Sequence, residues 1–348
     1  MTDDFSSAHV PLPTERHPES FQVPAVKRSE IWHPDGSVVL QAQDTQWRVH
    51  FSVLAMHSSF FRGMLGLPQP PDQPSVDGCP IIELLGDSVE DVENVLRALY
   101  DPSVFHIFTC YVWFPDRHPD FFFLQKALPF SVIASHLRLG RKYDFGADLE
   151  TIVERITHEN PTTLEGYDAL KTGNSYHPTR IVHYQGLLYD TITLAGENNL
   201  LSVLPCAYYR ALVGTIPADI FDGVPRGDGS VATLSPIHRR ACNLGRTALL
   251  RAQWDSGNTF GWTDDSPEEI GCRDPFGCGQ KKYAFFRRHV VRGSLAPFCS
   301  VSYVDSLSLC RMCTPDVKAK MITGRQRMWD LLPAYFDLPP WSELKNDP

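Results

Sequence analysis

The sequence has no long hydrophobic run and no export signal. No stretch of about 18 consecutive apolar residues occurs in it, so neither a transmembrane helix nor a membrane partner is expected. The first residues, Met-Thr-Asp-Asp-Phe-Ser-Ser, lack the positive charge and apolar core of a secretory signal. We therefore expect an intracellular protein of the cytoplasm or nucleus. Its nine cysteines are then reduced thiols, buried side chains or metal ligands, not disulfides.

Motifs of the common enzyme classes are also missing. The chain contains no Gly-x-Ser-x-Gly, no His-Glu-x-x-His and no Walker-type glycine loop, and no repeat of the kind that builds a propeller. A net charge of −9 argues against nucleic acid as the main partner. With 348 residues and 43% hydrophobic content, the chain can form two sizeable cores. These features predict a non-enzymatic globular protein.

Residues 38–65 predict two strands followed directly by two short helices. Apolar residues alternate with polar ones at 38–42 and 46–50, which is the period of half-buried strands. After His50 the apolar spacing becomes helical, with Ser58 as a candidate cap for the second helix and Gly66 as a stop. Another strand is expected at 81–84, and helices are expected after Ser88, at 132–144 and after Gly146.

Several of these residues resemble the BTB/POZ domain family. In that family a strand ending in a valine-histidine pair leads to a leucine-alanine helix, a serine-x-x-phenylalanine turn and a later lysine-tyrosine pair. The corresponding fold-motif residues here are Trp47, Val49, His50, Leu54, Ser58, Phe61, Lys142 and Tyr143. Residues 137–145 resemble the form found in a large fungal, basidiomycete-type family. The resemblance implies an α+β fold with a short mixed sheet flanked by helices, and a role in protein–protein interaction. It also makes His50 a structural residue.

Two segments depart from the compact family pattern. An aromatic-rich insertion at about 101–128 forms either a local hydrophobic subcore or a binding patch. Residues 1–28 are rich in proline and polar residues and predict a disordered segment. No extra N-terminal strand of the kind that some relatives exchange between subunits is expected there, which leaves homo-oligomerisation open.

The second half of the chain predicts a mainly α-helical domain. We expect a BTB/POZ-like domain at 29–158 and a helical domain at 175–345. Three apolar faces at helical spacing are expected. One passes through Ile181, Tyr184, Leu188, Ile192 and Ala195, one follows Pro205, and one covers 236–253 with Ile237, Ala241, Leu244 and Ala248 inward. This half also resembles the helical extension of the fungal family, whose role is poorly defined.

Cysteines near the C-terminus form the sharpest chemical pattern. Cys310 and Cys313 have the two-residue spacing with which two thiolates bind one ion, and Cys272 and Cys278 flank a turn-rich loop. Together they predict either a structural zinc site or four buried thiols with no cofactor, with Cys299 as a rival ligand.

A basic run at 281–292 stands out in this acidic chain. It contains Lys281, Lys282, Arg287, Arg288, His289 and Arg292. The run is either a solvated helix face, with Tyr283, Phe285 and Phe286 buried on the other side, or a patch for nucleic acid or an acidic partner.

Three classes of function follow. The first is a protein-binding adaptor, in one version a substrate adaptor of a cullin-type ubiquitin ligase complex, with the cullin on the helices at 92–99 and 132–143. The second is a scaffold or transcription-associated oligomerisation protein. The third and least favoured is a metal-dependent enzyme centred on the cysteines.

Overall fold

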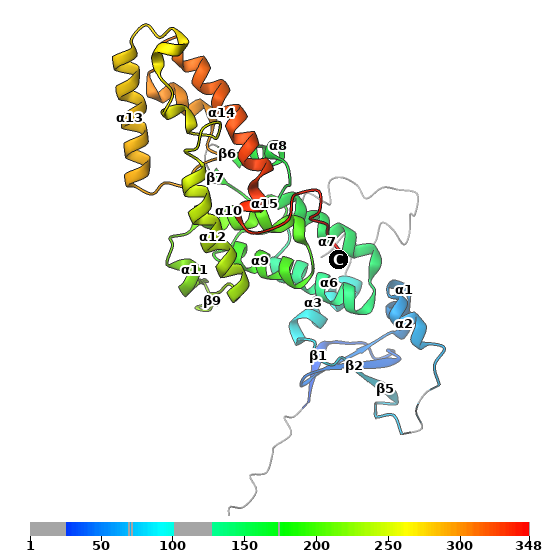
Figure 1. Cartoon of the computed structure of the whole chain (residues 1–348). Coiled ribbons are helices and arrows are strands. Elements are labelled where there is room, and N and C mark those ends of the chain that lie inside the picture. Colours follow the sequence, from blue (N-terminus) through cyan, green and yellow to red (C-terminus); the bar gives the residue numbers. More distant parts are fainter. Residues whose placement is uncertain (1–25, 69, 71, 101–126, 173–174, 348) are drawn as a thin grey trace, which may run out of the picture.

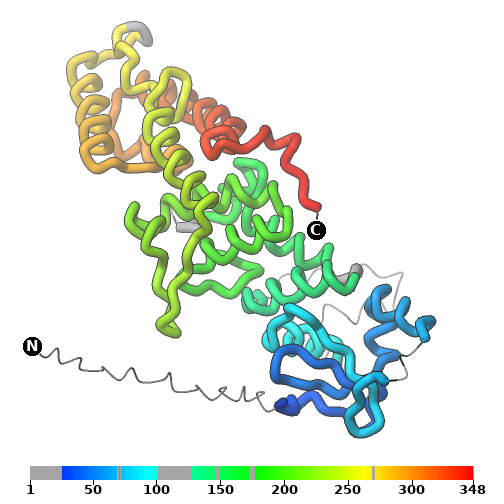
Figure 2. Tube along the Cα trace, turned by 60° about the horizontal axis from the view of Figure 1, so that its bottom comes forward, coloured from blue at the N-terminus to red at the C-terminus, as the bar shows by residue number. Residues whose placement is uncertain are grey.

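The molecule is elongated, with a sheet at one end and a long helix at the other (Figures 1 and 2). The structure is a computed structural model that describes residues 26–68, 70, 72–100, 127–172 and 175–347. Most of the segment 1–28 and of the aromatic insertion at 101–128 therefore lies outside the described residues. None of the described helices is both long and apolar enough to span a bilayer.

The sheet has five strands in the order β1-β3-β2-β5-β4. They are β1 (Lys27–Trp32), β2 (Val38–Ala42), β3 (Thr45–Val49), β4 (Ser75–Val76) and β5 (Cys79–Glu83). The predicted hairpin is confirmed: β2 and β3 are antiparallel, with Leu40 opposite Trp47. β5 runs parallel to β2, so the sheet is mixed, as the fold class requires.

Strand β1 was not predicted. It begins at Lys27, two residues before the expected start of the domain, and pairs in parallel with β3. Lys27 and Arg28 are exposed, as is Glu30, because β1 is an edge strand. An edge strand of this kind carries charged side chains and shows no apolar alternation. Its sequence therefore gives little signal.

Five helices accompany the sheet among the described residues up to 159. They are α1 (Phe51–His57), α2 (Ser59–Met64), α3 (Val89–Tyr100), α6 (Phe130–Tyr143) and α7 (Gly146–Glu159). The predicted start of α3 is confirmed, since the Ser88 Oγ accepts a hydrogen bond from the Asp91 N–H at 3.0 Å. Helix α6 lies between α3 and α7, and most of its side chains are buried for that reason.

Buried His136 on α6 makes this part of the fold sensitive to acid. Its Nδ1 lies 2.8 Å from the Val132 carbonyl oxygen, and burial lowers the pKa of His136 from 6.5 to about 4. His136 in the folded state therefore stays neutral at pH values at which the same side chain in the unfolded chain is protonated. This contribution is complete above pH 6.5 and is lost as the pH falls towards 4, at about 1.4 kcal/mol per pH unit and about 3 kcal/mol in total.

Urea unfolding at pH 7 and pH 5 measures this contribution. We expect His136→Leu to reduce the difference in unfolding free energy between the two pH values. Replacement of the exposed His177 by glutamine is the control and leaves the difference unchanged. Equal pH dependence in the His136 variant and the original protein would contradict the assignment.

Helices form most of the second half, as predicted. The α-helices are α8 (Leu164–Ala169), α9 (Leu187–Glu197), α10 (Leu204–Gly214), α11 (Asp219–Asp222), α12 (Pro236–Ala252), α13 (Pro275–Val291), α14 (Cys313–Asp330) and α15 (Leu332–Tyr335). Four 3-10 helices lie between them: η1 (Leu201–Val203), η2 (Gly261–Thr263), η3 (Pro267–Ile270) and η4 (Val301–Leu307). Two short ladders pair β6 (Lys171–Thr172) with β7 (Ser175–Tyr176) and β8 (Val224–Pro225) with β9 (Val231–Ala232).

Two predicted helix faces are wrong in part. The helix expected to include Ile181 and Tyr184 begins only at Leu187, because Ile181 pairs with Leu128 in an isolated bridge and Gly186 has a positive φ of 99°. On α12, Ile237 is 71% exposed and Leu244 41% exposed.

The buried face of α12 instead contains His238, Ala241, Cys242, Gly245 and Leu249. The close packing of α12 against Phe336 determines which face of the helix is buried. A Cβ on Gly245 would lie 2.2 Å from ring atoms of Phe336, so only glycine lets the two segments meet. The Tyr208 hydroxyl lies 2.6 Å from His238 Nδ1 on the same face.

One hydrophobic core continues from the sheet into the helical half. It extends from Val38 to Phe336 and, through Leu164 and Tyr167, crosses the segment between the two expected domains. A smaller, separate core lies at the far end of the molecule and consists of Phe260, Trp262, Phe285, Val304, Val317 and Met321. The physically distinct unit is therefore this far end, which we call the distal unit (residues 254–321).

Candidate functional site

Four cysteines from separate segments meet in the distal unit. Cys272 follows η3 and Cys278 lies in the first turn of α13, whereas Cys310 follows η4 and Cys313 begins α14. Their sulfur atoms all lie within 4.8 Å of one another, and those of Cys272 and Cys310 are 3.6 Å apart. The tertiary structure thus brings together all four of the cysteines that the spacing suggested.

The geometry of this cluster fits a tetrahedral metal site. Zinc–sulfur bonds of about 2.3 Å place the sulfurs of a tetrahedron about 3.8 Å apart, close to the 3.6 Å between Cys272 and Cys310. A disulfide would need about 2.05 Å, and the eight cysteines among the described residues are all free. Four sulfurs leave no open position for a substrate, which is the pattern of structural zinc.

Backbone N–H groups and helix ends surround the sulfurs. The Cys310 N–H donates to Cys278 Sγ at 3.3 Å, and the Cys313 N–H donates to Cys310 Sγ at 3.5 Å. The latter bond is the main reason that the pKa of Cys310 is lowered to about 6. Burial and the neighbouring thiols raise the pKa of Cys313. Cys278 and Cys313 also lie at helix N-termini, whose dipoles favour negative charge.

The rival ligand Cys299 lies outside the cluster. Burial raises the pKa of Cys299 to about 11, despite the nearby Arg325 and Lys171. It packs beside the distal core as a half-buried thiol. The spacing of the cysteines in the sequence could not exclude Cys299 as a ligand, because the distance between sulfur atoms depends on the tertiary structure.

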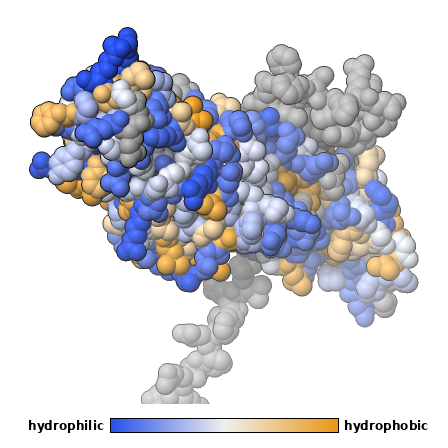
Figure 3. Space-filling view, turned by 45° about the horizontal axis from the view of Figure 1, so that its top comes forward, coloured by the Kyte–Doolittle hydropathy of each residue, from blue (hydrophilic) through white to orange (hydrophobic). Residues whose placement is uncertain are grey.

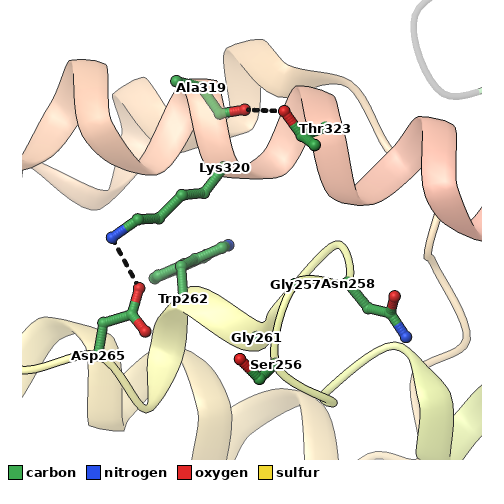
Figure 4. Close-up of a pocket in the computed structure, with 9 residues that line it drawn as sticks. All are labelled: Ser256, Gly257, Asn258, Gly261, Trp262, Asp265, Ala319, Lys320 and Thr323. Atoms are coloured by element: carbon green, nitrogen blue, oxygen red, sulfur yellow. Dashed lines mark hydrogen bonds and ion pairs between the residues drawn. The ribbon is translucent and has the colours of Figure 1, made fainter.

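A cavity of about 440 Å³ lies beside η2 and α14 (Figure 4). Lys320 extends across it to Asp265, with 2.8 Å between Nζ and Oδ2, and Trp262 lies below (Figure 4). Sequence reasoning did not single out any of these residues. The described residues that line the cavity include no histidine or cysteine.

The fold-motif residues lie at the other end of the molecule. Trp47, Val49, Leu54 and Phe61 are at most 2% exposed and belong to the main core. The period-two and helical spacings placed them there, and they hold the β2–β3 hairpin against α1 and α2.

Ser58 and Tyr143 connect the α1–α2 hairpin to the end of α6. The Ser58 hydroxyl donates to the Tyr143 carbonyl oxygen and accepts from the Phe61 N–H, which caps α2. The Tyr143 hydroxyl donates to Asp87 at 2.5 Å, and the Lys142 ammonium group donates to the same carboxylate at 2.6 Å. The lysine-tyrosine pair therefore anchors the end of α6 to the loop before α3.

His50 has structural partners on both ring nitrogens. Its Nδ1 lies 3.1 Å from the Tyr100 hydroxyl, which also accepts the His50 backbone N–H at 2.7 Å. Its Nε2 lies 3.2 Å from Asp35 Oδ2. These contacts join β3 to the end of α3.

A scan against protein-family models matches residues 36–106 to the BTB/POZ domain. The chain carries a BTB/POZ domain. Such domains are protein–protein interaction modules, and here the short mixed sheet and its helices precede a mostly helical region. No curated protein and no solved structure matches the chain.

The BTB/POZ domain exposes apolar side chains on and after its first helical hairpin. Met56 on α1 is 58% exposed, and Phe60 on α2, Leu65 and Leu67 are also exposed. We call these four residues the hairpin patch. A group of large apolar side chains on one exposed hairpin is typical of an interaction surface.

The expected cullin surface, on α3 and α6, exposes mainly polar and charged side chains. The apolar residues of α3 are buried, and α6 exposes little besides Ser131, Arg138 and Lys142, because α3 and α7 cover it. The exposed side of α3 instead carries Glu90 and Arg97. A partner on this side would therefore meet mainly charged groups.

Proposed function

We propose that this protein is a non-enzymatic interaction protein of the cytoplasm or nucleus, with a BTB/POZ-like domain at 29–158 and a helical domain at 175–345. The observation that carries the proposal is the family match at 36–106 together with the exposed hairpin patch. Free thiols at all eight described cysteines support the intracellular location. Residues 137–145 support membership of the fungal BTB family.

In one version of this proposal the protein is a substrate adaptor for a cullin-type ubiquitin ligase complex. The BTB/POZ domain would hold the cullin, and the helical half would select the client protein. The opposite ends of the elongated molecule support this division, because a partner at one end leaves the other end free (Figure 1).

A pull-down with purified cullin of the type that serves BTB proteins tests this version. The hairpin patch adjoins the expected cullin surface, since the rings of Phe60 and of Tyr143 at the end of α6 have centroids 5.2 Å apart. We expect binding of the full chain, and a loss of at least about tenfold in affinity for Met56→Glu, because a charge would replace apolar contact there. Ile322→Glu on α14 is the matched control, since Ile322 is similarly exposed at 57%. Absence of association even at high protein concentration would rule out the cullin version.

The alternative is a scaffold or transcription-associated oligomerisation protein. The same hairpin patch supports it, because two copies can bury it against each other. Native mass spectrometry discriminates the two: an oligomer that becomes a monomer in Met56→Glu, without cullin binding, favours the scaffold.

The cofactor in this proposal is one structural zinc ion held by Cys272, Cys278, Cys310 and Cys313. Its support is the sulfur geometry and the donor set, because four cysteine thiolates are a common ligand set of structural zinc. A structural role suits the distal unit, whose core contains only six fully buried hydrophobic residues.

A further inference from the structure

The four residues of the cysteine cluster differ in their exposure to solvent. Cys278 and Cys313 are 1% and 0% exposed, whereas Cys272 and Cys310 are half-buried. The sulfur atoms of the two half-buried cysteines are 3.6 Å apart. The distal unit that contains them forms one end of the elongated molecule, on the left of Figure 3, where hydrophilic and hydrophobic surface lie side by side. A small molecule in the solvent can therefore reach this adjacent pair more easily than the other two cysteines.

The half-buried pair has the features of redox-sensing cysteines. A metal ion binds cysteine as the thiolate, which is also the form that peroxides oxidise. The Cys313 N–H donates to Cys310 Sγ at 3.5 Å, and such a bond stabilises a thiolate. Cys310 is thus partly accessible, is stabilised as a thiolate and has the sulfur of Cys272 beside it. Redox-sensing cysteines combine accessibility, thiolate character and a neighbouring cysteine in the same way.

We propose that Cys272 and Cys310 form a peroxide-sensitive pair, and that oxidation of this pair to a disulfide releases the zinc ion. The inference rests on the structural zinc of the proposed function and deepens it by naming how that site is regulated. The two remaining thiols, Cys278 and Cys313, are too few for the four-coordinate ligand set of structural zinc. Disulfide formation and loss of zinc are therefore coupled.

The reaction transfers two electrons from the pair to hydrogen peroxide. The Cys310 thiolate attacks one peroxide oxygen, the O–O bond breaks, hydroxide leaves and a sulfenic acid remains on Cys310. The Cys272 thiolate then attacks the Cys310 sulfur, which forms the S–S bond and displaces a second hydroxide. Protons from the solvent convert both hydroxides to water and protonate Cys278 and Cys313 as the zinc ion leaves.

The positions of the cysteines favour this pair over Cys310 and Cys313, which are closer in sequence. Cys313 is fully buried and begins α14, whereas Cys272 and Cys310 both lie outside the helices and strands. A disulfide needs about 2.05 Å between its sulfur atoms, so the 3.6 Å between Cys272 and Cys310 must shorten by about 1.5 Å. Two loop residues can make this movement without displacing a helix.

Loss of the zinc ion removes one of the few buried anchors of α13. The buried side of this helix contains Cys278, Lys282 and Phe285. The Lys282 ammonium group donates to two backbone carbonyl oxygens there. The expectation that Tyr283, Phe285 and Phe286 are all buried is wrong in part, because Tyr283 is 64% and Phe286 36% exposed. Only Phe285 packs in the distal core, so the metal ligand Cys278 is a substantial part of what holds α13.

Peroxide titration of the full, zinc-loaded chain tests the proposal. Released zinc is measured with a metallochromic indicator, and disulfides are mapped by mass spectrometry after the free thiols have been alkylated. We expect about one zinc ion released for each disulfide between Cys272 and Cys310. A thiol reductant with added zinc should restore both thiols and the bound metal. Zinc retained in excess peroxide, or zinc released without a disulfide between these two residues, would overturn the proposal.

A variant that keeps the metal but lacks the pair gives a second test. Cys272→His retains a zinc ligand, because three cysteines and one histidine are also a structural zinc set. We expect peroxide to release its zinc at least about tenfold more slowly, since Cys310 has lost its partner. Cys299→Ser is the matched control and releases zinc at the original rate, because Cys299 is half-buried but lies outside the cluster.

Equal release rates in Cys272→His and the original protein would contradict the assignment of the pair. Where Cys272→His binds no zinc, the disulfide map of the original protein decides. Metal content before oxidation separates this inference from the proposal on which it rests. A bound zinc that survives peroxide overturns only the redox inference, whereas a folded chain without zinc overturns the structural zinc and the inference together. The cullin pull-down tests Met56 on α1 and depends on neither result.

Discussion

Replacement of Cys278 or Cys313 by serine is expected to abolish metal binding and to unfold the distal unit. Each residue connects the N-terminus of a long helix to the sulfur cluster. Apparent binding energies of structural zinc are about 10–16 kcal/mol in zinc-finger peptides, comparable with the total stability of a domain, about 5–15 kcal/mol. The six-residue distal core is too small to replace that contribution.

Native mass spectrometry and hydrogen exchange measure the two effects. We expect one zinc per chain in the original protein, none in Cys313→Ser, and fast exchange at 260–321 with the sheet still protected. Cys299→Ser is the matched control and retains the metal, because Cys299 lies outside the cluster. A metal-free but fully protected original protein would remove both the structural-zinc proposal and the metal-dependent enzyme.

Trp329→Ala is expected to destabilise the whole protein by about 3–5 kcal/mol, as for other fully buried tryptophans. Trp329 on α14 is 1% exposed and contacts the rings of Tyr167 on α8 and Phe298 at 5.1 and 5.0 Å. Its Nε1–H donates to the Thr162 carbonyl oxygen at 2.8 Å. One turn earlier, Arg325 donates to both carboxylate oxygens of Asp168.

These contacts connect α14 to the segment that precedes the helical half. Their loss should therefore destabilise the core that the two halves share. Urea unfolding followed by far-UV circular dichroism should give a lower midpoint for the main transition. Trp32→Ala on edge strand β1 is the control, with an expected loss below about 1.5 kcal/mol. A loss below 1.5 kcal/mol in Trp329→Ala as well would show that the two halves are held together elsewhere.

Local patterns were sufficient to predict several elements of the first domain. Strands β2 and β3, the capped helices α2 and α3, and the start of α6 each have a period or a cap that depends only on nearby residues. Strand β1 lacked such a pattern because one of its sides is open to solvent. Helix α12 was predicted at 236–253, one residue longer than observed, and with a face that is wrong in part, because the fit of Gly245 against Phe336 decides its rotation.

The cysteine cluster of the distal unit was likewise only partly predictable from local sequence. Spacing identified Cys310 and Cys313 as a pair, because two residues of separation bring two sulfurs within reach of one ion. Nothing local related them to Cys272 and Cys278, which lie over thirty residues away. The exposure of Tyr283 was equally invisible, since an aromatic residue on an amphipathic helix is compatible with either side.

By itself the sequence determined the class of the fold, the BTB/POZ resemblance, the metal-ligand candidates and the excess of cations near residue 287, because periodicity, motif and charge are properties of neighbouring residues. Only the tertiary structure decided which residues share a core, which four sulfurs meet, and which aromatics of α13 remain in solvent. Burial and proximity depend on contacts between segments far apart in the chain, and no local pattern records them.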